Sequence, residues 1–159
     1  MHKKILIIFS LFVAFTGILL ILHLSFREGG RSADNNSPKT KITLYKSPNC
    51  GCCVKYVSYL KKQGFTVETI PTNDMSSIKT EHQIPRNMES CHTMVIGNYF
   101  IEGHVPLEAV NKLLVEKPDI DGISLPDMPA GTPGMPGIKQ GKWQVYSLKD
   151  GQPSEYMSL

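Results

Sequence analysis

The sequence has no strong excess of either charge outside its N-terminal segment, no internal repeat and no glycine triplet period. Residues 42–159 hold eleven basic and twelve acidic residues, whereas residues 1–41 hold six basic and two acidic ones. A nearly neutral domain offers no electrostatic footprint for a phosphate backbone, so we expect no nucleic-acid partner. The missing glycine period excludes collagen, and a hydrophobic content of 41% is too high for a disordered chain. With 159 residues, the chain has room for one domain and a short additional segment.

A run without charged residues extends from Ile5 to Leu24. As a helix, this run would be about 30 Å long, which is enough to cross a hydrocarbon core. It lacks a following A-x-A cleavage pattern, and no cysteine follows it directly, which excludes lipoprotein anchoring. We therefore interpret residues 1–26 as an uncleaved transmembrane signal anchor. A cleaved signal peptide and a buried soluble helix are the alternatives.

The Lys/Arg count does not decide the orientation of this segment, because two basic side chains flank the run on each side. The short tail before the run is easily retained in the cytoplasm, which favours export of the rest. Residues 27–41 have the composition of a linker. We therefore expect residues 42–159 to be periplasmic and attached to the inner membrane through the N-terminal helix.

Residues 42–159 predict one small α/β domain. It begins with a strand over residues 42–46, a helix over residues 54–63 that ends before Gly64, and a strand over residues 65–70. Two strands connected by a helix within about 30 residues are parallel and form a right-handed unit.

The elements expected further along the chain extend this unit, and Gly97-Asn98 is the signal for a two-residue hairpin. They are a short helix over residues 75–82, strands over residues 93–96 and 99–101, and a helix over residues 106–116. The resulting order, β-α-β-α-β-β-α, is that of a thioredoxin-like fold. A Pro/Gly-rich loop over residues 117–142 and a closing hairpin over residues 143–158 complete the predicted domain.

All four cysteines, Cys50, Cys52, Cys53 and Cys91, lie in the predicted exported domain. An even number of cysteines in a small exported domain usually indicates structural disulfides. Three of these cysteines fall within four residues, however, and a bridge inside that cluster would close almost no loop and add little stability. We therefore expect the cysteines to serve chemistry more than structural stability.

Cys50 and Cys53 form a C-x-x-C motif at the start of the first predicted helix. The free N–H groups and the dipole of a helix N-terminus lower the pKa of a thiol, so we expect partial thiolate near neutral pH. A thiolate is both the nucleophile of disulfide exchange and a soft metal ligand. The motif alone therefore leaves a thiol–disulfide oxidoreductase and a metal site open.

Cys91 favours the metal site. In thioredoxin-like proteins a cis-proline precedes the third strand, and its neighbour faces the C-x-x-C motif. Here His92 stands at about the position of that proline and Cys91 directly before it. The predicted fold therefore brings a fourth thiol against the first three, which is the composition of a metal site.

The softness and spacing of these ligands favour copper. Cu(I) prefers thiolates and accepts two or three ligands, so bridging sulfurs can assemble a polynuclear cluster. Zinc is less favoured, because the adjacent Cys52 and Cys53 could bind one tetrahedral ion only with backbone strain. An iron–sulfur cluster also accepts four cysteines, but its assembly in an exported protein is unfavourable.

Two histidines are further candidate ligands. His92 adjoins Cys91, and His104 precedes a predicted helix at the edge where the C-x-x-C motif should lie. The alternative for both is a hydrogen-bonded loop residue. Met128 and Met135 could offer thioethers to incoming Cu(I), with loop packing as the alternative.

These motifs together resemble one family, the small exported metal-binding proteins of the CopG type found with bacterial copper-resistance systems. The motifs that carry the resemblance are Ser47-Pro48-Asn49-Cys50-Gly51-Cys52-Cys53, Ser90-Cys91-His92-Thr93, Gly103-His104-Val105-Pro106 and Met128-Pro129-x-Gly131-x-Pro133-Gly134-Met135. The resemblance implies a thioredoxin-like fold, a thiolate copper cluster and redox chemistry on copper. It implies Cys50, Cys52, Cys53 and Cys91 as ligands, with His92 and His104 secondary. The retained N-terminal anchor departs from the many relatives that look like cleaved periplasmic proteins.

The leading hypothesis is therefore an exported protein that holds Cu(I) in a thiolate cluster for copper resistance, with Cu(I)/Cu(II) interconversion as a further property. Its expected partners are copper ions and other exported copper-handling proteins. The alternatives are a thiol–disulfide oxidoreductase using Cys50 and Cys53, and a copper metallochaperone. Whether the protein turns over as an enzyme, for example as a copper oxidoreductase, stays open from the sequence.

Overall fold

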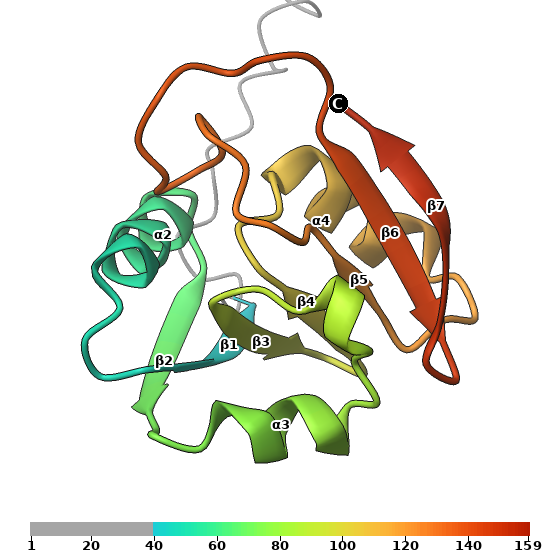
Figure 1. Cartoon of the computed structure of the whole chain (residues 1–159), viewed down its shortest axis with the longest axis horizontal. Helices are drawn as coiled ribbons and strands as arrows, with labels where there is room; N and C mark the ends of the chain where they lie inside the picture. Colours follow the sequence, from blue (N-terminus) through green and yellow to red (C-terminus); the bar gives the residue numbers. More distant parts are fainter. Residues whose placement is uncertain (1–39) are drawn as a thin grey trace, which may run out of the picture. The chain divides into compact units, whose positions relative to one another are not determined.

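The computed structural model describes residues 40–159, and the predicted signal anchor and most of the linker lie outside these residues. Within the described part, seven strands form one mixed sheet in the order β2-β1-β3-β4-β5-β6-β7 (Figure 1). The elements are β1 (Lys41–Lys46), α2 (Gly51–Lys62), β2 (Thr66–Pro71), α3 (Met75–Glu81), a 3-10 turn (Arg86–Met88), β3 (His92–Ile96), β4 (Tyr99–Glu102), α4 (Leu107–Glu116), β5 (Gly122–Ser124), β6 (Gln144–Lys149) and β7 (Gln152–Ser158). No helix in residues 40–159 is long and apolar enough to cross a membrane.

The first half of the domain confirms the predicted order of elements. β1 and β2 are connected by α2 and pair in parallel. β3 pairs antiparallel with β1 on one side and with β4 on the other. The mixed α/β class is confirmed as well, whereas the thioredoxin-like assignment stays a prediction. One boundary differs in a way that matters for the site. α2 begins at Gly51, so that Cys52 and Cys53 lie in its first turn, where we expected the helix to start at residue 54.

The second half corrects the prediction of one long loop over residues 117–142. The three-residue strand β5 lies within it, parallel to β4 and antiparallel to β6. The predicted closing hairpin, β6 and β7, therefore extends the main sheet instead of standing apart from it. β7 tolerates Pro153 because it is an edge strand.

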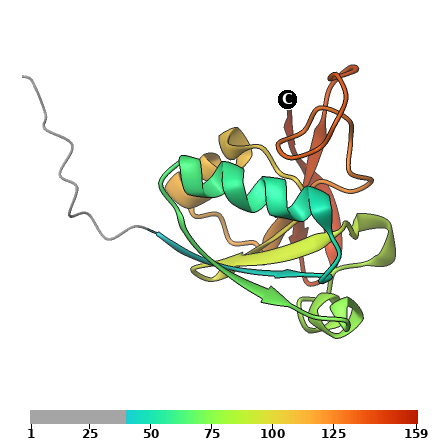
Figure 2. The same cartoon turned by 90° about the vertical axis from the view of Figure 1, so that its left-hand side faces the viewer.

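The sheet buries side chains on both of its faces. In β4, Ile101 belongs to the main core cluster, and the preceding residue, Phe100, packs in a second cluster on the opposite face. Figure 2 shows α2 and α3 on opposite sides of strands β1 to β3. The main core, which lies under α2 and α4, is formed by Ile42, Leu44, Tyr56, Val57, Leu60, Val67, Met94, Ile96, Ile101, Val105, Ala109, Val110, Leu113, Ile123, Leu125 and Val145.

Candidate metal centre

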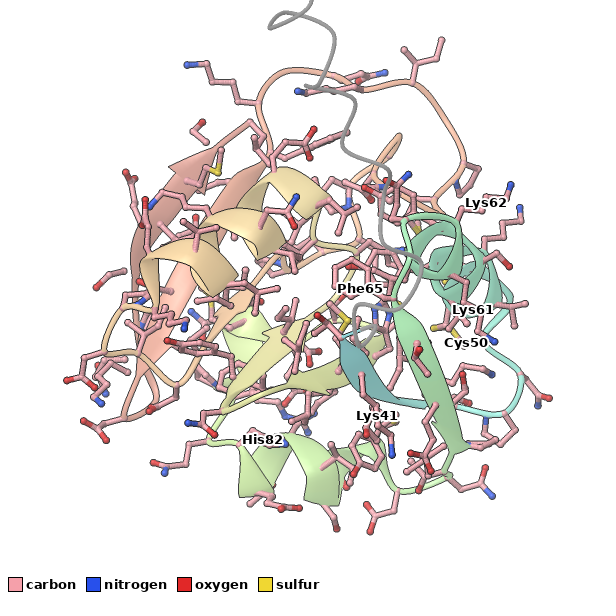
Figure 3. The ribbon with its side chains drawn as sticks, turned by 180° about the vertical axis from the view of Figure 1, so that it is seen from behind. Lys41, Cys50, Lys61, Lys62, Phe65 and His82 are labelled. Carbon is pink, nitrogen blue, oxygen red and sulfur yellow. A yellow bond between two sulfur atoms is a disulfide. The ribbon has the colours of Figure 1, made fainter. Side chains whose placement is uncertain are left out.

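Three of the cysteines lie at the beginning of α2, where a short turn follows β1. The turn is closed by a hydrogen bond from the Cys50 amide to the Ser47 carbonyl at 3.1 Å. The buried Lys46 ammonium donates to the carbonyls of Ser47 and Pro48 at 2.8 and 3.1 Å and holds the same turn. Cys50, labelled in Figure 3, is the N-cap, and its sulfur accepts from the Cys53 amide at 3.3 Å.

The pairing of β1 with β3 brings Cys91 to this helix end. Lys46, the last residue of β1, is the register partner of His92, the first residue of β3. Cys91 therefore lies beside the turn that leads into α2. Its Sγ atom is 3.6 Å from Sγ of Cys53 and 3.9 Å from Sγ of Cys52. The ligand atoms of all four cysteines lie within 4.8 Å of one another.

Cys50 and Cys53 are joined by a disulfide, whereas the predicted copper cluster requires all four cysteines as thiolates. The bridge connects the N-cap to the third residue of α2, with the two Cα atoms 5.4 Å apart. Cys52 and Cys91 remain free thiols. The expectation of partial thiolate character at Cys50 and Cys53 therefore applies only after this bridge is reduced.

Both candidate histidines are buried against Cys91. Sγ of Cys91 lies 3.3 Å from Nδ1 of His92 and 3.1 Å from Nε2 of His104. Nδ1–H of His104 donates to the Pro133 carbonyl at 2.7 Å, and this bond leaves the lone pair of Nε2 directed at the sulfur. Nε2 of His92 is buried without a hydrogen-bond partner in the described residues. The structure thus brings all six predicted site residues into one cluster.

Burial favours the neutral forms of Cys91, His92 and His104 in the absence of metal. Burial lowers the pKa of His104. Burial, and second to it the repulsion that a protonated His92 would meet from a protonated His104, lower the pKa of His92 well below its usual value. Burial also raises the pKa of the Cys91 thiol to about 12, and Cys52 adds to this effect. The imidazoles are therefore neutral and able to act as ligands at pH 7. Cys91 must release a proton when it binds a metal ion.

The Tyr56 side chain, on α2, packs against the two imidazoles. Its ring centroid lies 4.8 Å from that of His92 and 5.2 Å from that of His104. Its hydroxyl donates to the Val105 carbonyl at 2.7 Å, which satisfies the polar end of a fully buried ring. This role could not be predicted from the sequence, because a tyrosine at helical spacing carries no signal beyond that of a core residue.

A buried ion pair contacts the residues on either side of Cys91 and His92, and it was not predicted from the sequence. Lys79 of α3 and Glu102 of β4 form a salt bridge, and both side chains are almost inaccessible to solvent. The Glu102 carboxylate also accepts hydrogen bonds from the Ser90 amide and the Thr93 hydroxyl, each at 2.5 Å. Burial raises the pKa of Glu102, while the positive charge of Lys79 opposes this shift. No pattern in the sequence distinguishes these two charged residues from exposed ones.

The Pro/Gly-rich segment packs over the beginning of α2. Besides the bond from His104 to Pro133, the backbone of Gly134 lies so close to α2 that an added Cβ would be 2.8 Å from the Tyr56 nitrogen. Gly134 also has a φ of +86°. In the same segment, Met128 is 39% exposed and Met135 is half-buried. The two thioethers therefore lie on a segment that borders the site, and their role as copper contacts stays a prediction.

We expect Gly134→Ala to destabilise the domain more than Gly141→Ala. Both glycines have positive φ, so both substitutions carry backbone strain, but a Cβ at Gly141 would meet nothing within 4 Å. Overpacking against α2 should add about 1–3 kcal/mol to the cost at Gly134. Chemical denaturation of the two variants measures the difference. Equal losses of unfolding free energy in the two variants would show that a Cβ at residue 134 does not clash with α2.

The domain matches known proteins along most of its length. A family described as a protein of unknown function, DUF411, matches residues 88–135, which include Cys91, both histidines and the Met-containing segment. Two solved structures of copper resistance protein CopG, forms 2 and 1, are each 39% identical to the chain. They superpose with TM-scores of 0.71 and 0.70, cover 77% of this chain, and are themselves covered to 99% and 98%. The chain belongs to the CopG family. No curated protein matches the chain. The match to both CopG structures confirms the family resemblance that the cysteine and histidine motifs indicated.

Proposed function

We propose that this CopG family member is an exported copper-binding protein that holds Cu(I) in a polynuclear thiolate cluster and serves copper resistance. The observation that carries the proposal is the convergence of four sulfur ligand atoms within 4.8 Å. The ligands are Cys50, Cys52, Cys53 and Cys91. The names of the two similar structures, both copper resistance proteins, support copper as the metal.

The donor set fits Cu(I) better than zinc. Thiolates are soft ligands, and two adjacent cysteines can bridge neighbouring Cu(I) ions but are poorly placed for one tetrahedral zinc ion. The lone pair of His104 Nε2 and the buried imidazole of His92, whose Nε2 has no hydrogen-bond partner in the described residues, add two nitrogen donors beside Cys91. Imidazole also suits Cu(II), and the mixed set therefore supports Cu(I)/Cu(II) interconversion as part of the proposal.

Loading must be preceded by reduction of the disulfide between Cys50 and Cys53. Reduction takes two electrons and two protons from an added dithiol, which becomes a disulfide itself, and converts the bridge into two thiols. We expect the reduced protein to bind more than one copper per chain under anaerobic conditions and the oxidised protein to bind less. Elemental analysis after desalting measures both. A reduced protein with less than one copper per chain, or with a preference for zinc in competition, would contradict the proposal.

A second candidate function is thiol–disulfide exchange, and the disulfide itself is the observation that favours it. Sγ of Cys91 lies 3.6 Å from Sγ of Cys53, so that a free thiol faces one end of the bridge. Reduction of insulin by a dithiol in the presence of a strong copper chelator tests this function. Turnover that persists under chelation and is lost in Cys53→Ser would favour the oxidoreductase over the copper protein.

We further propose that the domain is thioredoxin-like, exported and attached to the inner membrane by residues 1–26. The order of elements from β1 to α4 supports the first part. The charge-free run from Ile5 to Leu24 supports the second. Fractionation of cells that produce the full chain, followed by protease treatment of intact spheroplasts, tests the location. Recovery of the protein in the cytosol, or its resistance to the protease, would contradict export.

A further inference from the structure

The buried pair of Lys79 and Glu102 calls for an explanation beyond stability. In a buried ion pair the Coulombic attraction roughly offsets the free energy lost in desolvating the two charges. Hydrophobic residues can often replace such a pair without a loss of stability. Neither side chain is a ligand in the proposed copper site, and the pair lies on the inner side of the segment that carries Cys91. What distinguishes the pair is the set of other groups that Glu102 binds.

Glu102 holds both ends of the segment that carries Cys91 and His92. One carboxylate oxygen accepts the Ser90 amide and the Lys79 ammonium, and the other accepts the Thr93 hydroxyl. Ser90 precedes Cys91, and Thr93 follows His92. The two residues that face the sulfur cluster are thus bracketed by hydrogen bonds to a single side chain.

The neighbouring backbone reinforces this arrangement. Thr93 and Glu102 are register partners in the antiparallel pair of β3 and β4, and the Gly103 amide donates to the His92 carbonyl at 2.9 Å. A Cβ at Gly103 would lie 2.6 Å from Oγ of Ser90, so only glycine lets the Ser90 end approach β4 this closely. The Glu102 side chain therefore acts on a segment that the sheet already places within reach.

We propose that Glu102 is a positioning residue that fixes Cys91 and His92 against the cysteines of α2, with Lys79 neutralising its charge. The expected effect on copper affinity rests on the proposed function, whereas the positioning of Cys91 and His92 concerns the metal-free protein. A carboxylate suits the task because it accepts on both oxygens, and three donors converge on it here. Outer partners that orient metal ligands commonly affect metal affinity strongly.

The first test uses the reduced, metal-free protein. Alkylation with iodoacetamide, followed by peptide mass spectrometry, gives the labelling rates of Cys91 and Cys52 in one sample. In Glu102→Ala we expect Cys91 to label several-fold faster relative to Cys52, because its segment is released while α2 is unchanged. Thr93→Val is a milder probe that keeps the side-chain volume and removes one hydrogen bond, and it should change the ratio in the same direction.

The second test measures Cu(I) affinity by competition with a coloured Cu(I) chelator. Loss of an outer partner typically lowers metal affinity about 10–100-fold, and we expect Glu102→Ala to fall in this range. The double variant Lys79→Met with Glu102→Gln should restore most of the affinity. Its amide can accept from the Ser90 amide and donate to Thr93, and it leaves no unpaired charge.

Leu113→Ala is the matched control, because Leu113 lies on α4 in the main core and its truncation destabilises the fold without removing a hydrogen bond to Ser90 or Thr93. We expect this control to lower the unfolding free energy without changing the labelling ratio or the copper affinity. An equal change in the control, or an unchanged ratio in both Glu102→Ala and Thr93→Val, would overturn the positioning role. If the parent protein fails to bind Cu(I) while the labelling ratio responds as expected, the proposed function fails and the positioning role stands.

Discussion

Replacing Cys91 with serine is expected to lower the copper content of the reduced protein and to weaken its Cu(I) affinity by more than ~100-fold, a larger effect than the loss of an outer partner. Serine keeps the size of the side chain and replaces the soft sulfur by a hard hydroxyl oxygen, which binds Cu(I) poorly. Anaerobic loading, elemental analysis and chelator competition on the parent and the variant measure the two quantities.

The expected effect is large because Cys91 is shared by two groups of donors. Its sulfur belongs to the four-cysteine group and also to the group formed with His92 and His104. Loss of this sulfur therefore separates the thiolates of α2 from the two imidazoles. Cys91 is also the only one of the four that is not carried by the beginning of α2.

Cys52→Ser provides the comparison for this prediction. Cys52 belongs to the four-sulfur group alone among the groups found in residues 40–159, so its loss should leave the Cys91–histidine group intact. We expect the Cys52 variant to retain more copper than the Cys91 variant at equal thermal stability. A Cys91 variant with the copper content and affinity of the parent would contradict the shared-ligand interpretation.

The elements that hold the cysteines could be predicted because they are specified locally. Alternation of apolar residues indicated the strands that became β1 and β2, and the helical spacing of apolar residues before Gly64 indicated the helix that became α2. The proximity of Cys91 was predicted from the position next to the cis-proline of thioredoxin-like proteins, which faces the C-x-x-C motif, and the structure brings its sulfur to 3.6 Å from that of Cys53. The assignment of these residues as copper ligands stays a prediction that loading experiments must test.

The remaining features depend on contacts between distant parts of the chain. β5 has only three residues in a Pro/Gly-rich region, and it is a strand because β4 and β6 pair with it on either side. Tyr56 and Glu102 appear in the sequence as an ordinary helix residue and an ordinary strand residue. Their roles arise from what the fold packs against them, namely the two imidazoles and the Cys91 segment. Local patterns do not contain this information.

Lys79→Met is expected to lower the unfolding free energy by about 3–5 kcal/mol at pH 7, because it leaves the Glu102 carboxylate buried without its cation. Methionine approximates the length and the apolar part of the lysine side chain, so the loss of packing is small. Chemical denaturation of the reduced, metal-free protein measures the effect. The double variant Lys79→Met with Glu102→Gln removes both charges, and its stability should return close to that of the parent.

The pH dependence of the Lys79→Met effect separates a lost charge from lost packing. Burial already raises the pKa of Glu102 in the folded parent, and removal of Lys79 takes away the positive charge that opposes this shift. The folded variant then binds a proton more tightly than the unfolded chain does, so its stability is greatest below the usual pKa of a glutamic acid and falls as the pH rises through the folded pKa. We therefore expect the loss caused by Lys79→Met to be smaller at pH 5 than at pH 8. A loss that is independent of pH, or one that persists in the double variant, would mean that the lysine contributes packing alone and that Glu102 does not need its charge balanced.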